Sequence, residues 1–193
     1  MEIFQIESLH RKYAPSPQVF ETVFTHCHIV WEIAGQLIRV KNLKVQEELV
    51  MSGALLHDIG AYTFIDVENH FDEKRYIRHG IEGYKILKEE GLPEELCRIA
   101  ERHTGVGITK RQIINRNLPL PLKDYTAETI EEQLIMYADK FHSKNPQFNS
   151  FDWYRAYTQR FGEDTVKKFE EFSHIFGIPE LESLSIKYRQ PIV

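Results

Sequence analysis

Residues 55–62, "LLHDIGAY", place a histidine directly before an aspartate at the end of an apolar run. The run itself, "LVMSGALL" at residues 49–56, is apolar nearly all round, which is typical of a helix at the centre of a domain. His57 and Asp58 are therefore predicted to be buried. Because buried imidazole and carboxylate groups cost free energy unless they are paired, the fold and the function both depend on their partners.

The composition limits the class of protein. The 193 residues, with 42% apolar and 27% charged, fit a single globular domain over residues 1–193. The net charge of -5 argues against a protein that coats nucleic acid, so we expect no nucleic-acid partner. The chain shows no signal-peptide core and no apolar run of about 20 residues, and its two cysteines form no CxxC. We therefore expect no membrane partner and a cytoplasmic location.

The spacing of apolar residues predicts an all-α fold, because β-branched alternation is nearly absent. Ser16 as N-cap and Pro17 at the first helical position predict a long helix that runs to about Val40. Gly60 is expected to end the next helix. Further helices are predicted at about 45–58, 75–90, from Pro93 past His103, and 127–142, with loops at 61–74 and 115–125.

The predicted first long helix separates two neighbouring histidines. His28 lies in a polar stripe and is expected to face solvent, whereas His26 stacks with Val30 and Ile33 and is expected to point inward. The pattern therefore selects His26 as the buried ligand. His10, His70, His142 and His174 stay unassigned, although His70 is a candidate for lining a cleft.

The inward-facing stripes carry six candidate metal ligands: His26, His57, Asp58, His79, His103 and Asp139. Imidazole nitrogen and carboxylate oxygen suit Fe, Mn, Co, Ni or Zn, with Mg as a further option. Six protein ligands are too many for one catalytic ion that keeps open positions, which favours two divalent ions bridged by Asp58. The alternative is one ion, with His79 and His103 binding phosphate directly.

The ordered series of motifs resembles the HD-domain superfamily of metal-dependent phosphohydrolases, and is most similar to the small stand-alone "HDIG" proteins. "HCHIVWEIA" (26–34) resembles the first-histidine helix, and "LLHDIG" (55–60) the defining His-Asp motif. "RHGIEGYKIL" (78–87), "AERHTGVG" (100–107) and "YADKF" (137–141) match the segments that carry the remaining ligands. The His-Thr-Gly at 103–105 also resembles the dinucleoside tetraphosphate hydrolases.

This resemblance implies a single-domain helical bundle of the HD-domain type. Its metal-binding core would span residues 17–145, and extra C-terminal helices at 150–190 would brace it. The aromatic residues of that segment are expected to pack in the core rather than to stack on bases: Trp153, Tyr157, Phe161, Phe169, Phe172 and Phe176.

The sequence departs from the family at one position. Many HDIG proteins carry a phosphate-binding lysine after the motif glycine, but this chain has Ala61 there. We therefore expect no phosphate-binding lysine at this position, and the cyclic-dinucleotide phosphodiesterase branch is disfavoured. Arg78, Lys110 and Lys140 are the candidate replacements, and solvated surface charge is the alternative for each.

The resemblance implies hydrolysis of a phosphate ester or anhydride of a nucleotide or small phosphorylated metabolite. Metal-bound hydroxide would attack phosphorus, with Asp58 as the catalytic residue that orients it. Two other functions stay open: a mixed-valence di-iron oxygenase of HD type, and a non-catalytic metal-binding module. The sequence leaves the oligomeric state open, a homo-oligomer included, and "LPLPL" (118–122) is either a lid or a simple connection.

Overall fold

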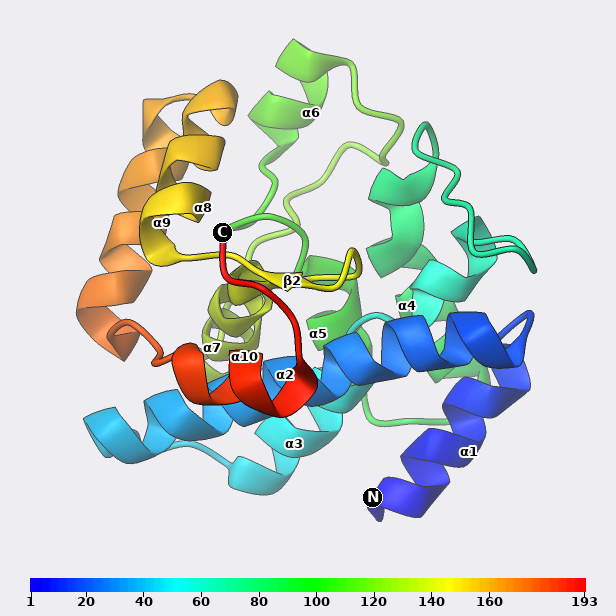
Figure 1. Cartoon of the computed structure of the whole chain (residues 1–193). Helices are drawn as coiled ribbons and strands as arrows, with labels where there is room; N and C mark the ends of the chain where they lie inside the picture. Colours follow the sequence, from blue (N-terminus) through cyan, green and yellow to red (C-terminus); the bar gives the residue numbers. More distant parts are fainter.

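The computed structural model describes residues 1–193 and consists almost entirely of helices (Figure 1). The predicted all-α class is confirmed, since the only sheet is a two-stranded antiparallel hairpin of β1 (His142–Ser143) and β2 (Gln147–Phe148). The α-helices are α1 (Ile3–Tyr13), α2 (Pro17–Lys41), α3 (Glu47–Leu56), α4 (His79–Glu89), α5 (Glu94–Arg102), α6 (Lys110–Arg116), α7 (Ile130–Ala138), α8 (Phe151–Thr158), α9 (Glu163–Phe176) and α10 (Glu182–Tyr188).

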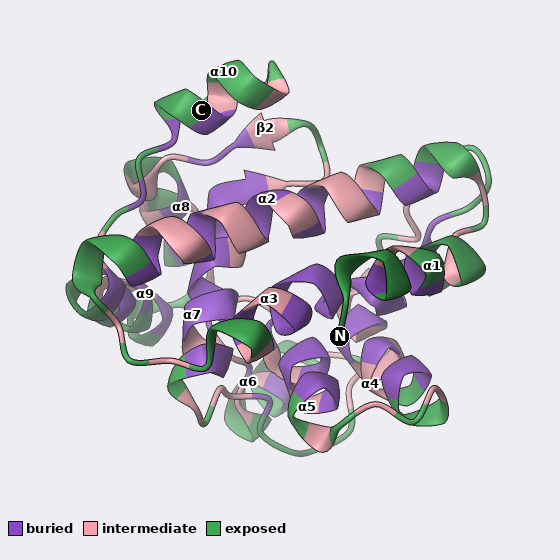
Figure 2. Cartoon of the chain, turned by 90° about the horizontal axis from the view of Figure 1, so that it is seen from below, coloured by how far each residue is buried: buried purple, intermediate pink, exposed green.

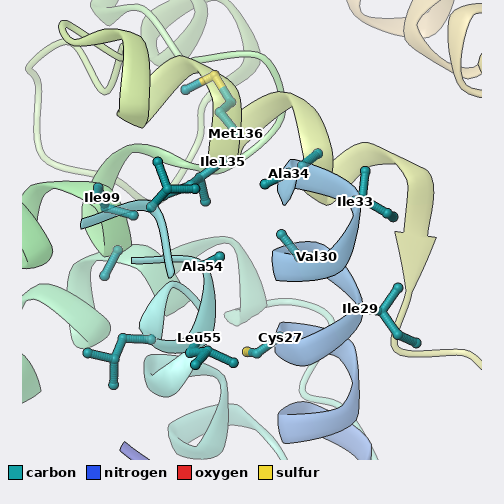
Figure 3. Packing of buried hydrophobic residues seen from close by; sticks show 14 of the residues in the cluster. Cys27, Ile29, Val30, Ile33, Ala34, Ala54, Leu55, Ile99, Ile135 and Met136 are labelled. Atoms are coloured by element: carbon teal, nitrogen blue, oxygen red, sulfur yellow. The ribbon is translucent and has the colours of Figure 1, made fainter. Parts of the chain in front are cut away.

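The long helix α2 follows the prediction closely. The Ser16 side chain accepts a hydrogen bond from the Val19 amide at 3.3 Å, and Pro17 occupies the first turn. The helix ends at Asn42, which adopts a left-handed conformation with φ 48°. Figure 3 shows side chains of α2, such as Cys27 and Ala34, facing those of α3 and α7 within one apolar cluster.

The helix α3 occupies the centre of the bundle. It contacts α2, α5, α7 and α1, and every residue from Ser52 to Tyr62 is buried (Figure 2). The chain turns out of α3 directly after Leu56. His57 and Asp58 therefore lie inside the molecule, and neither residue is exposed to solvent.

Gly60 has a different role from the one predicted. It does not end α3 but lies in the 3₁₀ helix η1 (Ile59–Phe64), so residues 61–64 are helical rather than loop. A Cβ at this position would lie 2.1 Å from the His79 carbonyl oxygen and 2.2 Å from the Gly83 amide nitrogen. The motif glycine therefore allows η1 to pack backbone to backbone against α4.

Other differences concern short elements. The sequence predictions omitted α1 and α6, and the predicted helix 127–142 is shorter than expected. After α7 the chain forms a 3₁₀ turn, η3 (Asp139–Phe141), and then the hairpin. The predicted helix 75–90 likewise opens as a 3₁₀ turn, η2 (Tyr76–Arg78).

His28 is half-buried rather than solvated, because α10 packs beside it. Its Nδ1 lies 3.0 Å from the Tyr188 hydroxyl and 3.1 Å from a Glu32 carboxylate oxygen. No helix of the chain combines the length and the apolar character that crossing a bilayer requires.

Candidate metal centre

The structure brings all six candidate ligands together from separate parts of the chain. His26 lies within α2, whereas the others stand where a helix begins or ends. His57 and His103 follow α3 and α5 directly, His79 opens α4, and Asp139 follows α7. Potential ligand atoms fall into two groups, each within 4.8 Å: His26, His57, Asp58 and Asp139, and then Asp58, His79 and His103.

Asp58 belongs to both groups through different oxygens. Its Oδ2 lies 3.2 Å from His26 Nε2 and 3.3 Å from His57 Nε2. Its Oδ1 lies 3.4 Å from His79 Nε2 and 3.5 Å from His103 Nε2. Asp139 Oδ1 completes the first group at 2.9 Å from His26 Nε2. This is the arrangement expected of a carboxylate that bridges two cations.

The backbone fixes the orientation of three imidazoles in the same way. Each Nδ1–H donates to the carbonyl three residues earlier: His57 to Ala54 at 2.7 Å, His79 to Tyr76 at 2.6 Å and His103 to Ala100 at 2.8 Å. A neutral imidazole that donates from Nδ1 keeps its lone pair on Nε2. All three Nε2 atoms therefore face the centre as potential ligands.

His26 is oriented by a chain of side chains instead. Its Nδ1 lies 2.9 Å from His142 Nδ1, and His142 Nε2 lies 2.6 Å from Gln190 Oε1. With the amide oxygen accepting from His142 Nε2–H, His142 Nδ1 must accept from His26 Nδ1–H. His26 Nε2 is then free to bind a cation. The sequence left His142 unassigned, and nothing in its local pattern indicates this contact.

Several polar atoms of the buried centre lack a hydrogen-bond partner. His57 Nε2 and Asp58 Oδ1 are buried without one, and Asp58 Oδ2 faces the ammonium of Lys144. His79 Nε2 and His103 Nε2 face each other at 2.9 Å, so two lone pairs converge. Burial lowers the pKa of His79 to about 3, so a proton does not relieve this contact at neutral pH. The nitrogen and oxygen donors therefore fit divalent transition-metal ions.

Both carboxylates stay ionised. Burial alone would raise the pKa of Asp58, but the ammonium of Lys144 outweighs burial and holds this pKa well below its usual value. Burial would likewise raise the pKa of Asp139, but the ammonium of Lys140 holds it well below its usual value. Lys144, which the sequence analysis did not select, contacts Asp58 Oδ2 as an ion pair.

A cavity of about 720 Å³ opens over the centre. Its walls come from the ligand residues, the β1–β2 hairpin and α8, and they include Tyr76, Lys140, Lys144, Trp153, Tyr154 and Tyr157. The expectation that aromatic residues after 150 form core is therefore only partly correct. Phe169, Phe172 and Phe176 are fully buried, but Trp153 is 39% exposed and lines the cavity with Tyr154 and Tyr157.

Two of the three predicted phosphate-binding residues lie elsewhere. Arg78 pairs with Glu82 at 3.6 Å, Lys110 is exposed on α6, and neither lines the cavity. Arg78 precedes the ligand His79 and Lys110 follows the His103 segment, but their places in η2 and at the start of α6 keep both out of the cavity lining. Lys140 does line the cavity. His70 is 72% exposed in the loop after η1, and no residue of 118–122 reaches the cavity, so neither borders it.

Comparison with known proteins identifies the family. A family model described as the HD domain matches residues 23–144, which is more than half of the chain. The chain belongs to the HD-domain family. The motifs of the sequence indicated the same family.

Several known proteins are similar to this chain in sequence. An uncharacterised protein of Methanocaldococcus jannaschii is 38% identical over 156 residues, covering 78% of this chain and 77% of its own length. A tRNA (cytidine(56)-2'-O)-methyltransferase of Picrophilus torridus is 34% identical over 161 residues, 81% of this chain but 43% of the relative. The Thermoplasma volcanium methyltransferase of the same name is 29% identical and is covered for 39% of its length. The chain thus spans less than half of the two methyltransferases.

Two solved structures share the fold. Both are the HD domain of the L. monocytogenes phosphodiesterase PgpH, at 16% sequence identity to this chain. One superposes with a TM-score of 0.53 over 86% of this chain and 94% of the other. The second, a complex with cyclic-di-AMP, gives 0.55 over 96% and 98%. At this identity the likeness shows the HD-domain fold alone.

Proposed function

We propose that this HD protein hydrolyses a phosphate ester or anhydride of a nucleotide or small phosphorylated metabolite with two divalent metal ions. The observation that supports this most directly is Asp58, whose two oxygens face two separate donor groups below a 720 Å³ cavity. A structural ion would need neither the second group nor an open cavity. An enzyme that places a phosphate against the ions would need both.

In this proposal the side chains of the centre have different roles. His26, His57, Asp58 and Asp139 would hold one ion, and Asp58, His79 and His103 the other. Bound divalent ions would acidify water and offset negative charge on the phosphate. Lys140 supports the ligands, because its Nζ donates to Asp139 Oδ2 at 2.6 Å and to the His103 carbonyl at 3.1 Å. Asp58 would orient the attacking water as the catalytic residue.

The cavity walls favour a nucleotide over a simple phosphate ester. Trp153 and Tyr157 stack on each other with ring centroids 5.4 Å apart and planes at 12°. Together with Tyr154 they form an aromatic wall of the cavity, whose ionic floor is formed by the ligand residues His26, His79, His103 and Asp139. A nucleobase gains about 1–3 kcal/mol from stacking on such a ring, whichever base it is. The substrate we propose therefore carries a phosphate toward the floor and a base toward α8.

The names of the relatives bear on this proposal in two ways. A PgpH HD domain binds cyclic-di-AMP, which is itself a nucleotide, and the fold is shared. The methyltransferases are more than twice as long as the part that matches, so we do not extend methyl transfer to this chain. We instead assign the hydrolytic centre to the matching part.

Phosphate release tests the proposal. Metal-free protein is loaded anaerobically with Mn²⁺, Co²⁺ or Fe²⁺ and assayed against a panel of nucleotides and phosphomonoesters. The account expects phosphate release without oxygen, whereas a di-iron oxygenase would need iron and consume oxygen. A fully loaded protein that releases no phosphate from any member would instead support the non-catalytic module.

The variant Asp58→Ala tests the site itself. Since Asp58 is the only residue in both donor groups, we expect bound metal to fall to a small fraction of wild type and turnover to fall at least about 1000-fold. Asp164→Asn, an exposed change on α9, is the matched control and should retain both. Elemental analysis and the phosphate assay measure the two effects, and turnover preserved in Asp58→Ala would refute the assignment.

A further inference from the structure

The β1–β2 hairpin carries a buried lysine that the function does not yet use. Lys144 lies in the turn between the strands, its side chain is 13% exposed, and its Nζ contacts Asp58 Oδ2. The ammonium also lies 5.6 Å from the centre of the Tyr76 ring. Lys144 and Tyr76 both line the cavity. The ammonium is therefore situated between the ionic floor and the space where a substrate would bind.

Few cationic side chains can reach that space. Lys140 and Lys144 are the only lysine or arginine residues that line the cavity. Both hydrogen bonds of Lys140 go to ligand residues, and its side chain is 5% exposed. Lys140 therefore stabilises the ligands and is not available to a substrate. The motif position that is often lysine is Ala61, which is fully buried. Lys144 is the one remaining candidate for contacting a phosphate.

Asp58, the ion-pair partner of Lys144, is also a candidate metal ligand. Asp58 Oδ2 is the oxygen that faces His26 and His57, so a metal ion held by that group would compete with the ammonium for this oxygen. A divalent ion interacts with the carboxylate about twice as strongly as an ammonium at equal distance. The lysine stem is flexible, and Lys144 already lines the cavity into which its ammonium would turn.

Resting on the function proposed above, we propose that Lys144 is the phosphate-binding lysine of this protein. It leaves Asp58 when metal binds and donates to an oxygen of the substrate phosphate. The hairpin thus provides the positive charge that the motif loop lacks at Ala61. Ammonium-to-phosphate hydrogen bonds are charge-assisted and are among the stronger ones in proteins.

Metal and phosphate binding should change in opposite directions in Lys144→Met. Mn²⁺ affinity, measured by titration calorimetry, should rise several-fold because a competing cation is removed. Affinity of the Mn²⁺-loaded protein for inorganic phosphate should fall at least about ten-fold, the equivalent of 1.4 kcal/mol. KM for a phosphate substrate should rise more than kcat falls. Lys144→Arg should recover most of the phosphate affinity, and Lys110→Met, outside the cavity, should match wild type.

The outcomes distinguish this proposal from the function on which it rests. Unchanged phosphate affinity in loaded Lys144→Met overturns the role of Lys144, whatever the activity of the wild type. Weaker Mn²⁺ binding in that variant overturns it too, because Lys144 would then support the centre rather than compete with metal. Wild type that binds Mn²⁺ and phosphate yet hydrolyses nothing overturns the proposed hydrolysis and leaves the Lys144 result intact.

Discussion

Individual imidazoles in this protein are oriented by backbone carbonyls. His57, His79 and His103 each stand at a helix end and donate Nδ1–H to a carbonyl three residues earlier. For His57 and His103 the helix end matters because the carbonyls of a last turn have no intrahelical partner. His79 instead follows the 3₁₀ turn η2 and opens α4. One local hydrogen bond thus fixes the tautomer and directs Nε2 toward the centre. The scaffold needs no separate acid to orient these three ligands.

Helical periodicity predicted the burial of a candidate ligand where a long helix is present. Position on the α2 stripe separated His26, which is 1% exposed, from His28 two residues later. The same reasoning could not find Lys144 or His142. Both stand in or beside a hairpin whose strands are two residues long, too short for any alternation of polar and apolar residues.

His10 gives a prediction for stability against pH. It is fully buried, with Nδ1 2.8 Å from the Tyr62 hydroxyl and Nε2 2.7 Å from the Leu55 carbonyl. Burial lowers its pKa from 6.5 to about 4. The unfolded chain therefore binds a proton between pH 6.5 and 4 that the folded chain does not, so stability falls as pH falls through this window. The loss from this residue is about 3 kcal/mol at 1.36 kcal/mol per pKa unit.

Urea unfolding from pH 7 to pH 4 measures this loss. His10→Asn removes the titration, so its free energy of unfolding should be lower at pH 7 but should fall less steeply with acid than that of the wild type. His174→Asn, an exposed change on α9, should keep the wild-type slope. Parallel slopes for wild type and His10→Asn would contradict this account of the buried histidine.

Among the secondary-structure elements, the long helices can be predicted from the sequence, whereas the short ones cannot. The start of α2 is predictable because Ser16 and Pro17 are strong N-terminal signals, and its end coincides with Asn42. The 3₁₀ segments η1, η2 and η3 flank ligands and carry no periodic signal of their own. This is why the sequence selected ligand candidates that the structure brings together, while the elements around them were predicted too long or as loops.

The helix α8 gives a prediction for substrate choice. Trp153→Ala combined with Tyr157→Ala removes the stacked pair of the aromatic wall. KM for a nucleotide should rise about ten-fold, because base stacking contributes about 1–3 kcal/mol. KM for a phosphomonoester without a base should change little. Steady-state kinetics on both substrates measures the difference.

A matched control is Phe4→Ala, which removes a 66% exposed aromatic side chain of α1 far from the cavity in sequence. It should leave both KM values at wild-type levels. An equal rise for the two substrates in the α8 double variant would show that the wall shapes the centre rather than recognises a base.

At the scale of the whole molecule, the C-terminal residues complete the centre. The Phe148 amide donates to the Pro191 carbonyl at 2.8 Å, and the Val193 amide to the Phe148 carbonyl at 2.9 Å. Figure 1 shows this segment running beside β2. It brings Gln190 to His142, which orients His26. The predicted division into a 17–145 core and 150–190 bracing helices stays a prediction, but residues after 150 contribute to the cavity and to the ligands as well as to packing.

The central claim is that six side chains from distant parts of the fold hold two divalent ions around Asp58. Anomalous diffraction from a crystal of the Mn²⁺-loaded protein, collected with X-rays at the metal edge, tests it directly. The account predicts one peak between His26, His57, Asp58 and Asp139 and a second between Asp58, His79 and His103. A loaded crystal with no anomalous peak beside Asp58, or with peaks only at surface groups such as Asp66 and His70, would contradict it.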